Sequence, residues 1–187
     1  MIGAVLSGGG GRRMGGGKHA AQLGGRPLIS YPLEALAQAC DPVAVVCKAA
    51  TELPDLGDYE RWDEPDEPQH PLTGIVHALE RAGAPVLVCA ADMPFVTADA
   101  CRTLLAGAGG GGSAPAAVAA AKGEIQPVFG VYSPASLDGL RAAAPGAPLM
   151  ATVEGLDPAR VALPPPMLRS VNTPEELAEA EEELSSG

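Results

Sequence analysis

Short apolar runs alternate with amphipathic stretches along this chain. The runs at residues 2–6, 42–47 and 85–89 contain almost no polar position, as is typical of strands buried on both faces of a sheet. Between them, residues 27–39 and 72–82 place apolar side chains at helical spacing. The pattern therefore predicts strands connected by helices.

The second half of the chain continues this alternation. We expect helices at residues 97–105, 133–143 and 173–184, and strands at residues 127–132 and 161–163. Because helices connect the first strands, the sheet should be mainly parallel with right-handed crossovers. These elements predict an α/β fold with a doubly wound, mainly parallel sheet and helices on both faces.

Three of the expected helices carry start signals. Pro27 suits a first helical turn, Thr73 is a plausible N-cap, and Thr-Pro-Glu-Glu at residues 173–176 opens the last helix. By contrast, the glycine run at residues 107–112 holds no cation and is expected to be a flexible linker after a helix.

Length and composition limit the architecture. The chain has 187 residues, of which 47% are hydrophobic and only 3% aromatic, so one core built from Ala, Val and Leu is expected. We expect a single domain over residues 1–187. No apolar run approaches the roughly 20 residues of a membrane span, and no signal peptide is evident. The protein is therefore expected to be cytoplasmic, without membrane association.

The cysteines and histidines do not form a zinc pattern. The four cysteines never occur as C-x-x-C, and the three histidines are not placed at zinc-ligand spacing from them. We therefore expect reduced, mostly buried thiols at Cys40, Cys47, Cys89 and Cys101.

Residues 6–18 form a glycine-rich segment directly behind the first apolar run, with the sequence Leu-Ser-Gly-Gly-Gly-Gly-Arg-Arg-Met-Gly-Gly-Gly-Lys. Its glycines leave backbone N–H groups uncovered, and Arg12, Arg13 and Lys18 supply positive charge, which suits a polyphosphate. The spacing matches neither a P-loop, because Arg12 stands where its first glycine is needed, nor the G-x-G-x-x-G dinucleotide motif. We therefore expect a nucleoside triphosphate to bind here.

The charge distribution supports a small anionic ligand. The whole chain carries a net charge of −11, yet its first carboxylate is Glu34, so residues 1–33 hold four cations and no anion. An acidic protein with one local basic site is poorly suited to a nucleic-acid backbone. Nucleic acid is therefore not an expected partner.

Asp92 follows the third apolar run, where ligands of such sheets bind beyond the carboxyl ends of the strands. A carboxylate at this place can hold Mg²⁺ against the phosphates. An N-cap for the helix that follows Pro94 is an equally good interpretation of the spacing.

The motifs together resemble the molybdenum cofactor guanylyltransferases. The resemblance is carried by L-x-G-G-x-x-x-R-M-G-x-x-K from residue 6, Leu-Gly-Gly-Arg-Pro-Leu from residue 23, Asp63, His-Pro-Leu-Thr-Gly from residue 70, Asp-Met-Pro-Phe from residue 92, Gln126-Pro127 and Asn-Thr-Pro-Glu-Glu from residue 172. It covers nearly the whole chain. It implies a Rossmann-like fold of the nucleotide-diphospho-sugar transferase type.

The resemblance also implies an activity, namely Mg²⁺-dependent transfer of GMP from GTP to the phosphate of molybdenum-bound molybdopterin, with release of pyrophosphate. Backbone amides should wrap the triphosphate, cations should neutralise its β- and γ-oxygens, one carboxylate should carry magnesium, and another should contact the nucleotide. The residues implied in these roles are Leu6, Ser7, Gly8, Gly9, Gly10, Gly11, Arg13, Lys18, Asp63 and Asp92. A carboxylate could also accept from N1–H and N2–H of guanine.

Guanine rather than cytosine is suggested by Gly8-Gly9, where the similar cytidylyltransferases usually have Ala-Gly. Departures from the family pattern lie at Gly17, Gln126 and Ser170. Asn172 is either a contact of the pterin acceptor or, like Thr173, an N-cap of the last helix. We expect residues 1–95 to bind the nucleotide and residues 96–187 to face the acceptor.

Two other functions stay open on sequence grounds. One is a related nucleotidyltransferase that uses CTP with molybdopterin, or acts on phospholactate or a sugar phosphate. The other is a nucleotide-binding protein without catalysis. For the guanylyltransferase that the resemblance implies, we expect transient contacts with proteins of molybdenum cofactor biosynthesis or with molybdoenzymes.

Overall fold

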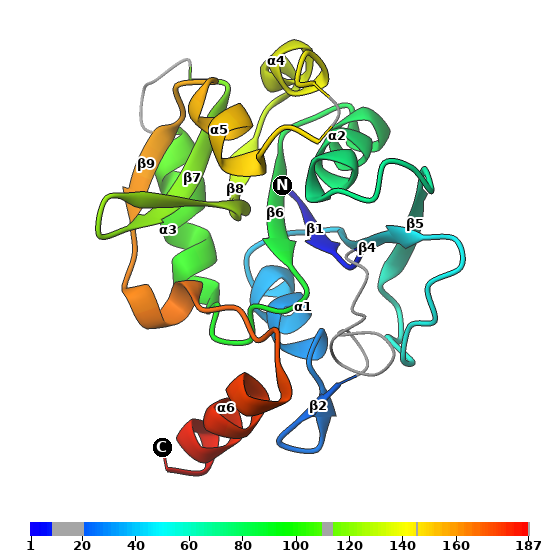
Figure 1. Ribbon diagram of the computed structural model, residues 1–187, viewed down its shortest axis with the longest axis vertical. Helices are drawn as coiled ribbons and strands as arrows, with labels where there is room; N and C mark the ends of the chain where they lie inside the picture. The colour runs from blue at the N-terminus through cyan, green and yellow to red at the C-terminus, as the bar shows by residue number, and fades with distance from the viewer. Residues whose placement is uncertain (9–20, 110–113, 145, 187) are drawn as a thin grey trace.

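A computed structural model describes residues 1–8, 21–109, 114–144 and 146–186. Within these ranges, the largest sheet has seven strands in the order β5-β4-β1-β6-β8-β7-β9 (Figure 1). Its central strands are the three predicted apolar runs, which form β1 (Ile2–Leu6), β4 (Val43–Lys48) and β6 (Val86–Ala90). The expected strands near residues 127–132 and 161–163 are β8 (Glu124–Tyr132) and β9 (Ala159–Ala162).

The sheet is mainly parallel, which confirms the expected fold class. Strand β1 pairs in parallel with both β4 and β6, and β4 pairs in parallel with β5 (Glu60–Glu64). Only β8 is antiparallel to its neighbours β6 and β7 (Ala116–Ala121). Strand β9 pairs in parallel with β7 at the other edge.

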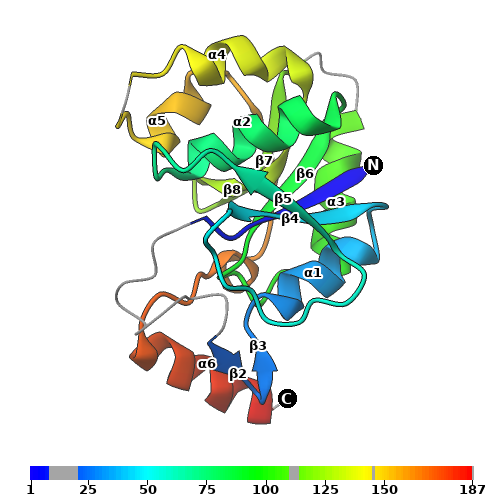
Figure 2. The same ribbon diagram turned by 90° about the vertical axis from the view of Figure 1, so that its right-hand side faces the viewer.

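Helices cover both faces of the sheet (Figure 2). One face carries α1 (Ser30–Ala37) and α3 (Ala98–Gly109), and the other carries α2 (Pro71–Ala82), α4 (Leu137–Arg141) and α5 (Leu149–Glu154). The side chains of β1 alternate between the two layers, as strand geometry requires. Val5 packs in the α1/α3 core, whereas Ala4 and Leu6 pack in the α2 core.

Several predicted boundaries are wrong, each for a local reason. Pro27 does not open a helix, because it pairs with Gln22 in a small hairpin of β2 (Gln22–Leu23) and β3 (Arg26–Pro27). Helix α3 continues to Gly109, so the first part of the expected glycine linker is helical, while residues 110–113 lie outside the described residues. The predicted helix at residues 133–143 begins as a 3₁₀ turn, Pro134–Ser136, ahead of α4.

The N-cap of α2 is His70 rather than Thr73. The backbone N–H of Leu72 donates to Nδ1 of His70 at 3.2 Å. Thr73 turns its hydroxyl away and donates to the carbonyl oxygen of Pro68 at 2.8 Å. An imidazole nitrogen therefore does the capping that a hydroxyl usually does.

The last helix, α6 (Pro174–Ser186), begins with a capping box. The N–H of Glu176 donates to Oγ1 of Thr173 at 3.2 Å, and Oε2 of Glu176 accepts from the N–H groups of Asn172 and Thr173 at 2.5 and 3.2 Å. This reciprocal pattern satisfies otherwise unpaired donors at a helix start. Of the two capping candidates in the sequence, Thr173 therefore caps the helix.

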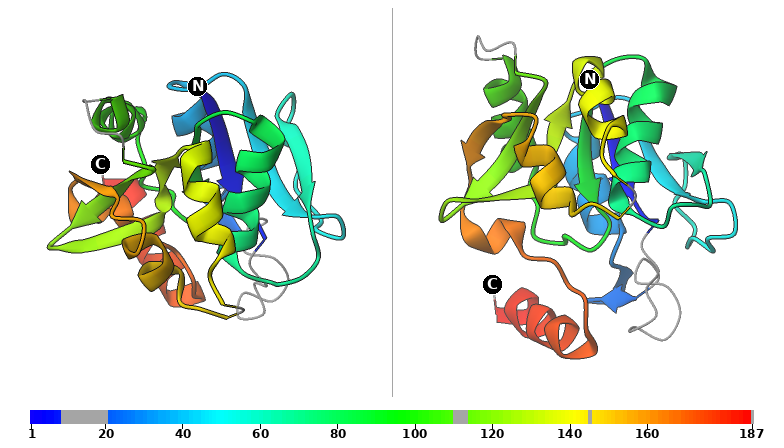
Figure 3. Two further views of the ribbon diagram at one scale, coloured as in Figure 1. Left: turned by 90° about the horizontal axis from the view of Figure 1, so that it is seen from above. Right: turned by 45° about the horizontal axis from the view of Figure 1, so that its top comes forward.

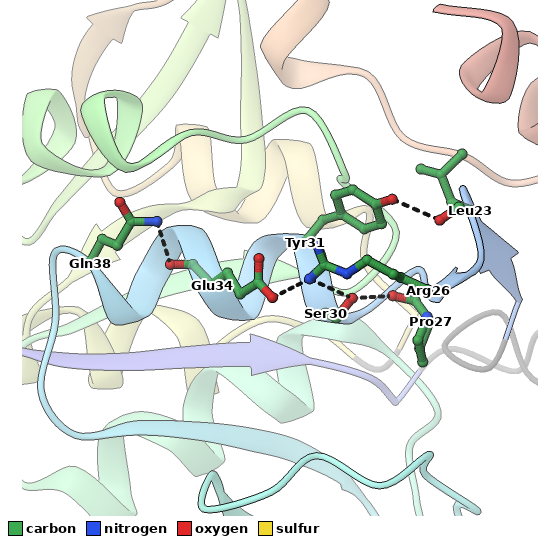
Figure 4. A network of polar contacts seen from close by, with 7 residues as sticks. All are labelled: Leu23, Arg26, Pro27, Ser30, Tyr31, Glu34 and Gln38. Carbon is green, nitrogen blue, oxygen red and sulfur yellow. Dashed lines mark hydrogen bonds and ion pairs between the residues drawn. The ribbon is translucent and has the colours of Figure 1, made fainter. Parts of the chain in front are cut away.

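Helix α6 does not cover the main sheet but lies beside the β2–β3 hairpin (Figure 3). A small apolar cluster joins them, formed by Leu23, Leu28, Val171 and Ala180 with Tyr31, Phe95 and Leu177 at its margin. Figure 4 shows how the hairpin is held to α1: the Tyr31 hydroxyl donates to the carbonyl oxygen of Leu23 at 2.7 Å, and Arg26 pairs with Glu34.

The four cysteines are free and buried, as expected. Burial raises the pKa of Cys40 to about 11 and that of Cys101 to about 12, which favours the inert thiol over the reactive thiolate. Among the described residues no helix is both long and apolar enough to cross a bilayer.

Candidate functional site

Gly8 and Asp92 follow neighbouring strands at the same edge of the sheet. Leu6 of β1 is in register with Ala90 of β6, and the N–H of Ala91 continues this pairing by donating to the carbonyl oxygen of Leu6 at 3.0 Å. On the other side of β1, the N–H of Ser7 donates to the carbonyl oxygen of Val46 at 2.8 Å. The carboxyl ends of β1 and β6 therefore present Ser7, Gly8 and Asp92 at one edge, as predicted.

A pocket of about 170 Å³ lies at this edge. Its walls come from the ends of β1, β5 and β6 and from the first turns of α2, and they include Ser7, Gly8, Glu64, His70, Gly74 and Asp92. Backbone, hydroxyl and carboxylate groups thus converge on one concave site, as in many small-molecule sites.

The residues predicted for the site fall into three groups. Leu6, Ser7, Gly8 and Asp92 line the pocket. Asp63 does not line it: its side chain is 56% exposed, and Oδ1 accepts from Nε of Arg61 at 2.7 Å. A third group, namely Gly9, Gly10, Gly11, Arg12, Arg13 and Lys18, lies outside the described residues.

Glu64 is a pocket residue that sequence reasoning missed. Along β5 the side chains alternate, so that Trp62 and Glu64 are buried while Asp63 between them is exposed. The Glu64 side chain is only 3% exposed, and its Oε1 lies 3.3 Å from Nζ of Lys48. Its Oε2 is also buried and has no hydrogen-bond partner among the described residues. Such an atom is costly to bury without a partner.

The electrostatics of Glu64 follow from this burial. Desolvation raises the pKa of its carboxyl above the ordinary 4.5, and the nearby Lys48 ammonium acts in the opposite direction. Lys48 therefore partly offsets the cost of burying the Glu64 carboxylate beside the pocket.

Two glycines make room for this carboxylate. A Cβ at Gly8 would overlap Oε1 of Glu64, and a Cβ at Gly74 would come within 3.1 Å of Oε2. A side chain at residue 8 would therefore require the Glu64 carboxylate to move, and one at residue 74 would crowd it. The first residue of the glycine segment and the first turns of α2 meet at the Glu64 side chain.

The polar groups of the pocket can hold a metal ion only if a bound substrate supplies further ligands to it. Within residues 1–8, 21–109, 114–144 and 146–186, no three His, Cys, Asp or Glu side chains gather to hold a metal ion. Mg²⁺, however, is commonly bound by one or two carboxylates together with substrate phosphates. Asp92 in the pocket wall supplies an oxygen ligand of the right chemistry.

The segment expected to face the acceptor passes next to Asp92. The N–H of Val171 donates to the carbonyl oxygen of Asp92 at 2.8 Å, and Ser170 lines the pocket. Gln126 reaches the same segment, because its Nε2 donates to the carbonyl oxygen of Leu168 at 3.3 Å. Of the departures and acceptor candidates in the sequence, Ser170 therefore lines the pocket, and Gln126 contacts the same segment two residues earlier, at Leu168.

The buried hydroxyl of Ser7 is a further group available to a ligand. Its Oγ is shielded from solvent and has no partner among the described residues, although the residue lines the pocket. The site therefore contains two buried oxygen atoms, on Ser7 and Glu64, whose hydrogen bonds are not made within the described protein.

Comparison with known proteins gives a consistent result. The family model of the MobA-like NTP transferase domain matches residues 3–159. A molybdenum cofactor guanylyltransferase of Cereibacter sphaeroides is 37% identical over 97% of this chain and 95% of its own length. One of Rhizobium leguminosarum is 34% identical over 100% of this chain and 94% of its own length.

Solved structures agree with the fold. Molybdopterin-guanine dinucleotide biosynthesis protein A from Archaeoglobus fulgidus aligns over 100% of both chains with a TM-score of 0.81 and 27% identity. The 2-C-methyl-D-erythritol 4-phosphate cytidylyltransferase from Thermus thermophilus aligns over 97% of this chain and 98% of its own with a TM-score of 0.71. At 18% identity, the second likeness concerns the fold alone.

Proposed function

Because this chain belongs to the MobA-like NTP transferase family and is a nucleotidyltransferase, we propose that it transfers GMP from GTP to the terminal phosphate of molybdenum-bound molybdopterin. The relatives named molybdenum cofactor guanylyltransferases, matched over nearly their full length, support this donor and acceptor. One structural observation supports the proposal: Ser7 and Gly8 at the start of the glycine segment, Asp92, and Ser170 border one pocket.

The triphosphate lies along the glycine segment in this proposal. Gly8 begins that segment at the pocket, and Arg13 and Lys18 farther along it neutralise the β- and γ-oxygens and the leaving pyrophosphate. No protein nucleophile is needed, because an acceptor phosphate oxygen attacks the α-phosphorus directly. The protein contributes positioning and charge neutralisation as the two anions approach each other.

The guanine base lies over Glu64 rather than Asp63. Guanine presents two adjacent donors, N1–H and N2–H, which match a carboxylate, whereas cytosine presents only its N4 amino group on that edge. Glu64 lines the pocket, and its buried Oε2 has no hydrogen-bond partner among the described residues, while Asp63 is exposed and engaged by Arg61. Gly8 and Gly74 adjoin this carboxylate and line the same pocket, so the base approaches the carboxylate from the pocket.

Asp92 is the residue that holds Mg²⁺ in this proposal, together with phosphate oxygens of GTP. When bound, magnesium supplies positive charge at the phosphates and thereby lowers the repulsion between donor and acceptor. Asp92 lies between the donor side, at Ser7 and Gly8, and the acceptor side, at Ser170 and Val171. Residues 1–95 thus serve mainly the donor and residues 96–187 mainly the acceptor.

An isotope experiment tests this function. With GTP labelled at the α-phosphorus and a molybdopterin acceptor, label should move to the dinucleotide product, whereas γ-label should leave as pyrophosphate. Asp92→Asn should lower turnover by about 100-fold or more, comparable to the loss of a single preorganised electrostatic contact. Transfer of γ-label to the acceptor, or unchanged turnover of Asp92→Asn, would overturn the proposal.

A further inference from the structure

The loop that carries Asp92 is held by the chain segment before α6. Asp92 is tied by its carbonyl oxygen to the N–H of Val171, at 2.8 Å. Three residues after Asp92, the ring of Phe95 lies under the guanidinium of Arg169, whose Cζ is 4.2 Å from the ring centroid. Residues 169–171 therefore contact the loop both at Asp92 and at Phe95.

Arg169 is in turn fixed by the terminal helix. Its two terminal nitrogens form a fork against the Glu183 carboxylate, with Nη1 to Oε1 at 2.7 Å and Nη2 to Oε2 at 2.9 Å. Bidentate geometry of this kind is directional as well as attractive, and the stacked ring restricts the guanidinium further. The Arg169 side chain is partly buried at 35% exposure, so solvent screens it less than a fully exposed pair.

The same helix also packs against the β2–β3 hairpin, which follows the glycine segment in the chain. Helix α6 packs against β2, and the small cluster beneath it joins Leu23 and Leu28 of the hairpin region to Val171 and Ala180. The hairpin begins at Gln22, two residues after residue 20, where the stretch outside the described residues ends. One peripheral helix therefore packs against the hairpin that follows the glycine segment in the chain and, at Phe95, against the loop that carries Asp92.

We propose that α6 is a latch that positions Asp92 for the metal–triphosphate complex, and that Arg169 is its positioning residue. This inference rests on the proposed function of Asp92. The Arg169–Glu183 pair fixes α6 to the segment that contacts the loop. The hydrogen bond from Val171 to Asp92 then fixes the backbone of Asp92. Loss of the pair leaves the main sheet intact, because α6 lies outside both large cores.

Charge reversal tests the latch. In Arg169→Glu, the new carboxylate faces Glu183 and repels it, and in Glu183→Arg two cations oppose each other. The double exchange restores an opposite-charge pair in the same place. Arg160→Glu is the control for charge reversal at the surface, because Arg160 pairs with Glu154 through a single 3.4 Å contact between β9 and α5.

The readout is the binding of Mn²⁺, a paramagnetic substitute for Mg²⁺, to the protein in the presence of GTP, measured by electron paramagnetic resonance. Each single reversal should weaken Mn²⁺ binding by about tenfold, a loss that small displacements of a positioned group readily produce. Metal-free GTP binding and the main unfolding transition should stay within about twofold and a few degrees of wild type, and the double exchange should recover most of the Mn²⁺ affinity.

The outcomes separate this inference from the proposed function. If wild type binds Mn²⁺ with GTP and Asp92→Asn does not, but Arg169→Glu binds as wild type does, the latch alone is overturned. Equal losses of metal-dependent and metal-free GTP binding in Arg169→Glu would also overturn it, because they indicate a general structural defect. Absence of Mn²⁺ binding in wild type with GTP would overturn the metal role of Asp92 and the latch together.

Discussion

The Cα of Gly8 lies directly against the carboxylate of Glu64, so closely that a Cβ on residue 8 would overlap Oε1. The first glycine of the glycine segment thus packs against a buried carboxylate more than 50 residues later in the chain, at the end of β5. This contact connects the glycine segment to the floor of the pocket.

Gly8→Ala should therefore disrupt the pocket. The added methyl group must displace either the glycine segment or the Glu64–Lys48 pair, and overpacking of this kind costs about 1–3 kcal/mol of the free energy of unfolding. GTP affinity, measured by titration calorimetry, should fall by at least about tenfold, or about 1.4 kcal/mol. Gly109→Ala is the control, because no atom of the described residues lies within 4 Å of a Cβ at that position. Wild-type GTP affinity in Gly8→Ala would show that the segment does not rest on Glu64 when nucleotide binds.

Glu64→Gln should change which purine nucleotide binds. The amide places an N–H₂ group against the guanine donors, but it can donate to the O2 oxygen of xanthine. GTP binding should weaken by about 10- to 100-fold, the usual range for a hydrogen bond to a charged group, while XTP should bind better than it does to wild type. A gain with XTP cannot come from general damage to the fold. Glu60→Gln, on the exposed start of the same strand, should leave both affinities unchanged.

The wild-type protein offers a test of the same contact without a substitution. ITP lacks the N2 amino group of GTP and should bind about tenfold more weakly, since one donor to Glu64 is missing. The 7-deaza analogue of GTP keeps N1–H and N2–H and should bind as GTP does. Equal affinities for GTP and ITP would argue against base recognition by this carboxylate.

Burial of Glu64 should also appear in the pH dependence of stability. Its pKa is raised in the folded protein above the ordinary 4.5. Below pH 4.5 the carboxyl is protonated in both states; as pH rises, the unfolded chain ionises first, so stability is lost until pH passes the higher folded-state pKa. Denaturant unfolding should show wild type losing stability relative to Glu64→Gln across this interval. A difference that does not change with pH would contradict the shift.

Substitutions of Asn172 and Thr173 should have different effects, one on acceptor binding and the other on the stability of α6. Thr173→Ala removes the capping hydroxyl of α6 and should cost about 1 kcal/mol in local stability, seen as faster amide exchange in α6. Asn172→Ala keeps the backbone N–H that Glu176 accepts from, so α6 should keep its exchange protection while the KM for the molybdopterin acceptor rises. Loss of α6 protection in Asn172→Ala, with unchanged acceptor KM, would assign Asn172 a structural role instead.

The sequence predicted the central strands because Val, Leu and Cys side chains buried on both faces leave an unmistakable apolar run, as in Val86–Ala90. The two strands of the main sheet that were not predicted, β5 and β7, lack that signal. In β5, Trp62 is the only apolar side chain among charged residues, and β7 is nearly all alanine, a residue that does not favour strands. Their place in the sheet is set by pairing with β4 and β8.

A site residue was predictable where it directly follows a strand with a clear apolar pattern. It was not predictable where its role depends on which face of a strand without such a pattern it occupies. Asp92 was identified because it follows β6, and the structure brings it next to Ser7 and Gly8. Glu64 could not be distinguished from Asp63, because a one-residue difference on β5 decides which carboxylate faces the pocket. Only tertiary pairing sets that face.

The central claim is that this protein uses GTP to guanylylate a molybdopterin acceptor. The most direct measurement is pyrophosphate release with each of GTP, CTP, ATP and UTP, with and without molybdenum-bound molybdopterin. We expect release with GTP that depends on both the acceptor and Mg²⁺, and at least about tenfold less with CTP, as loss of the guanine contact requires. Faster release with CTP than with GTP, or release with GTP that does not depend on the acceptor, would contradict it.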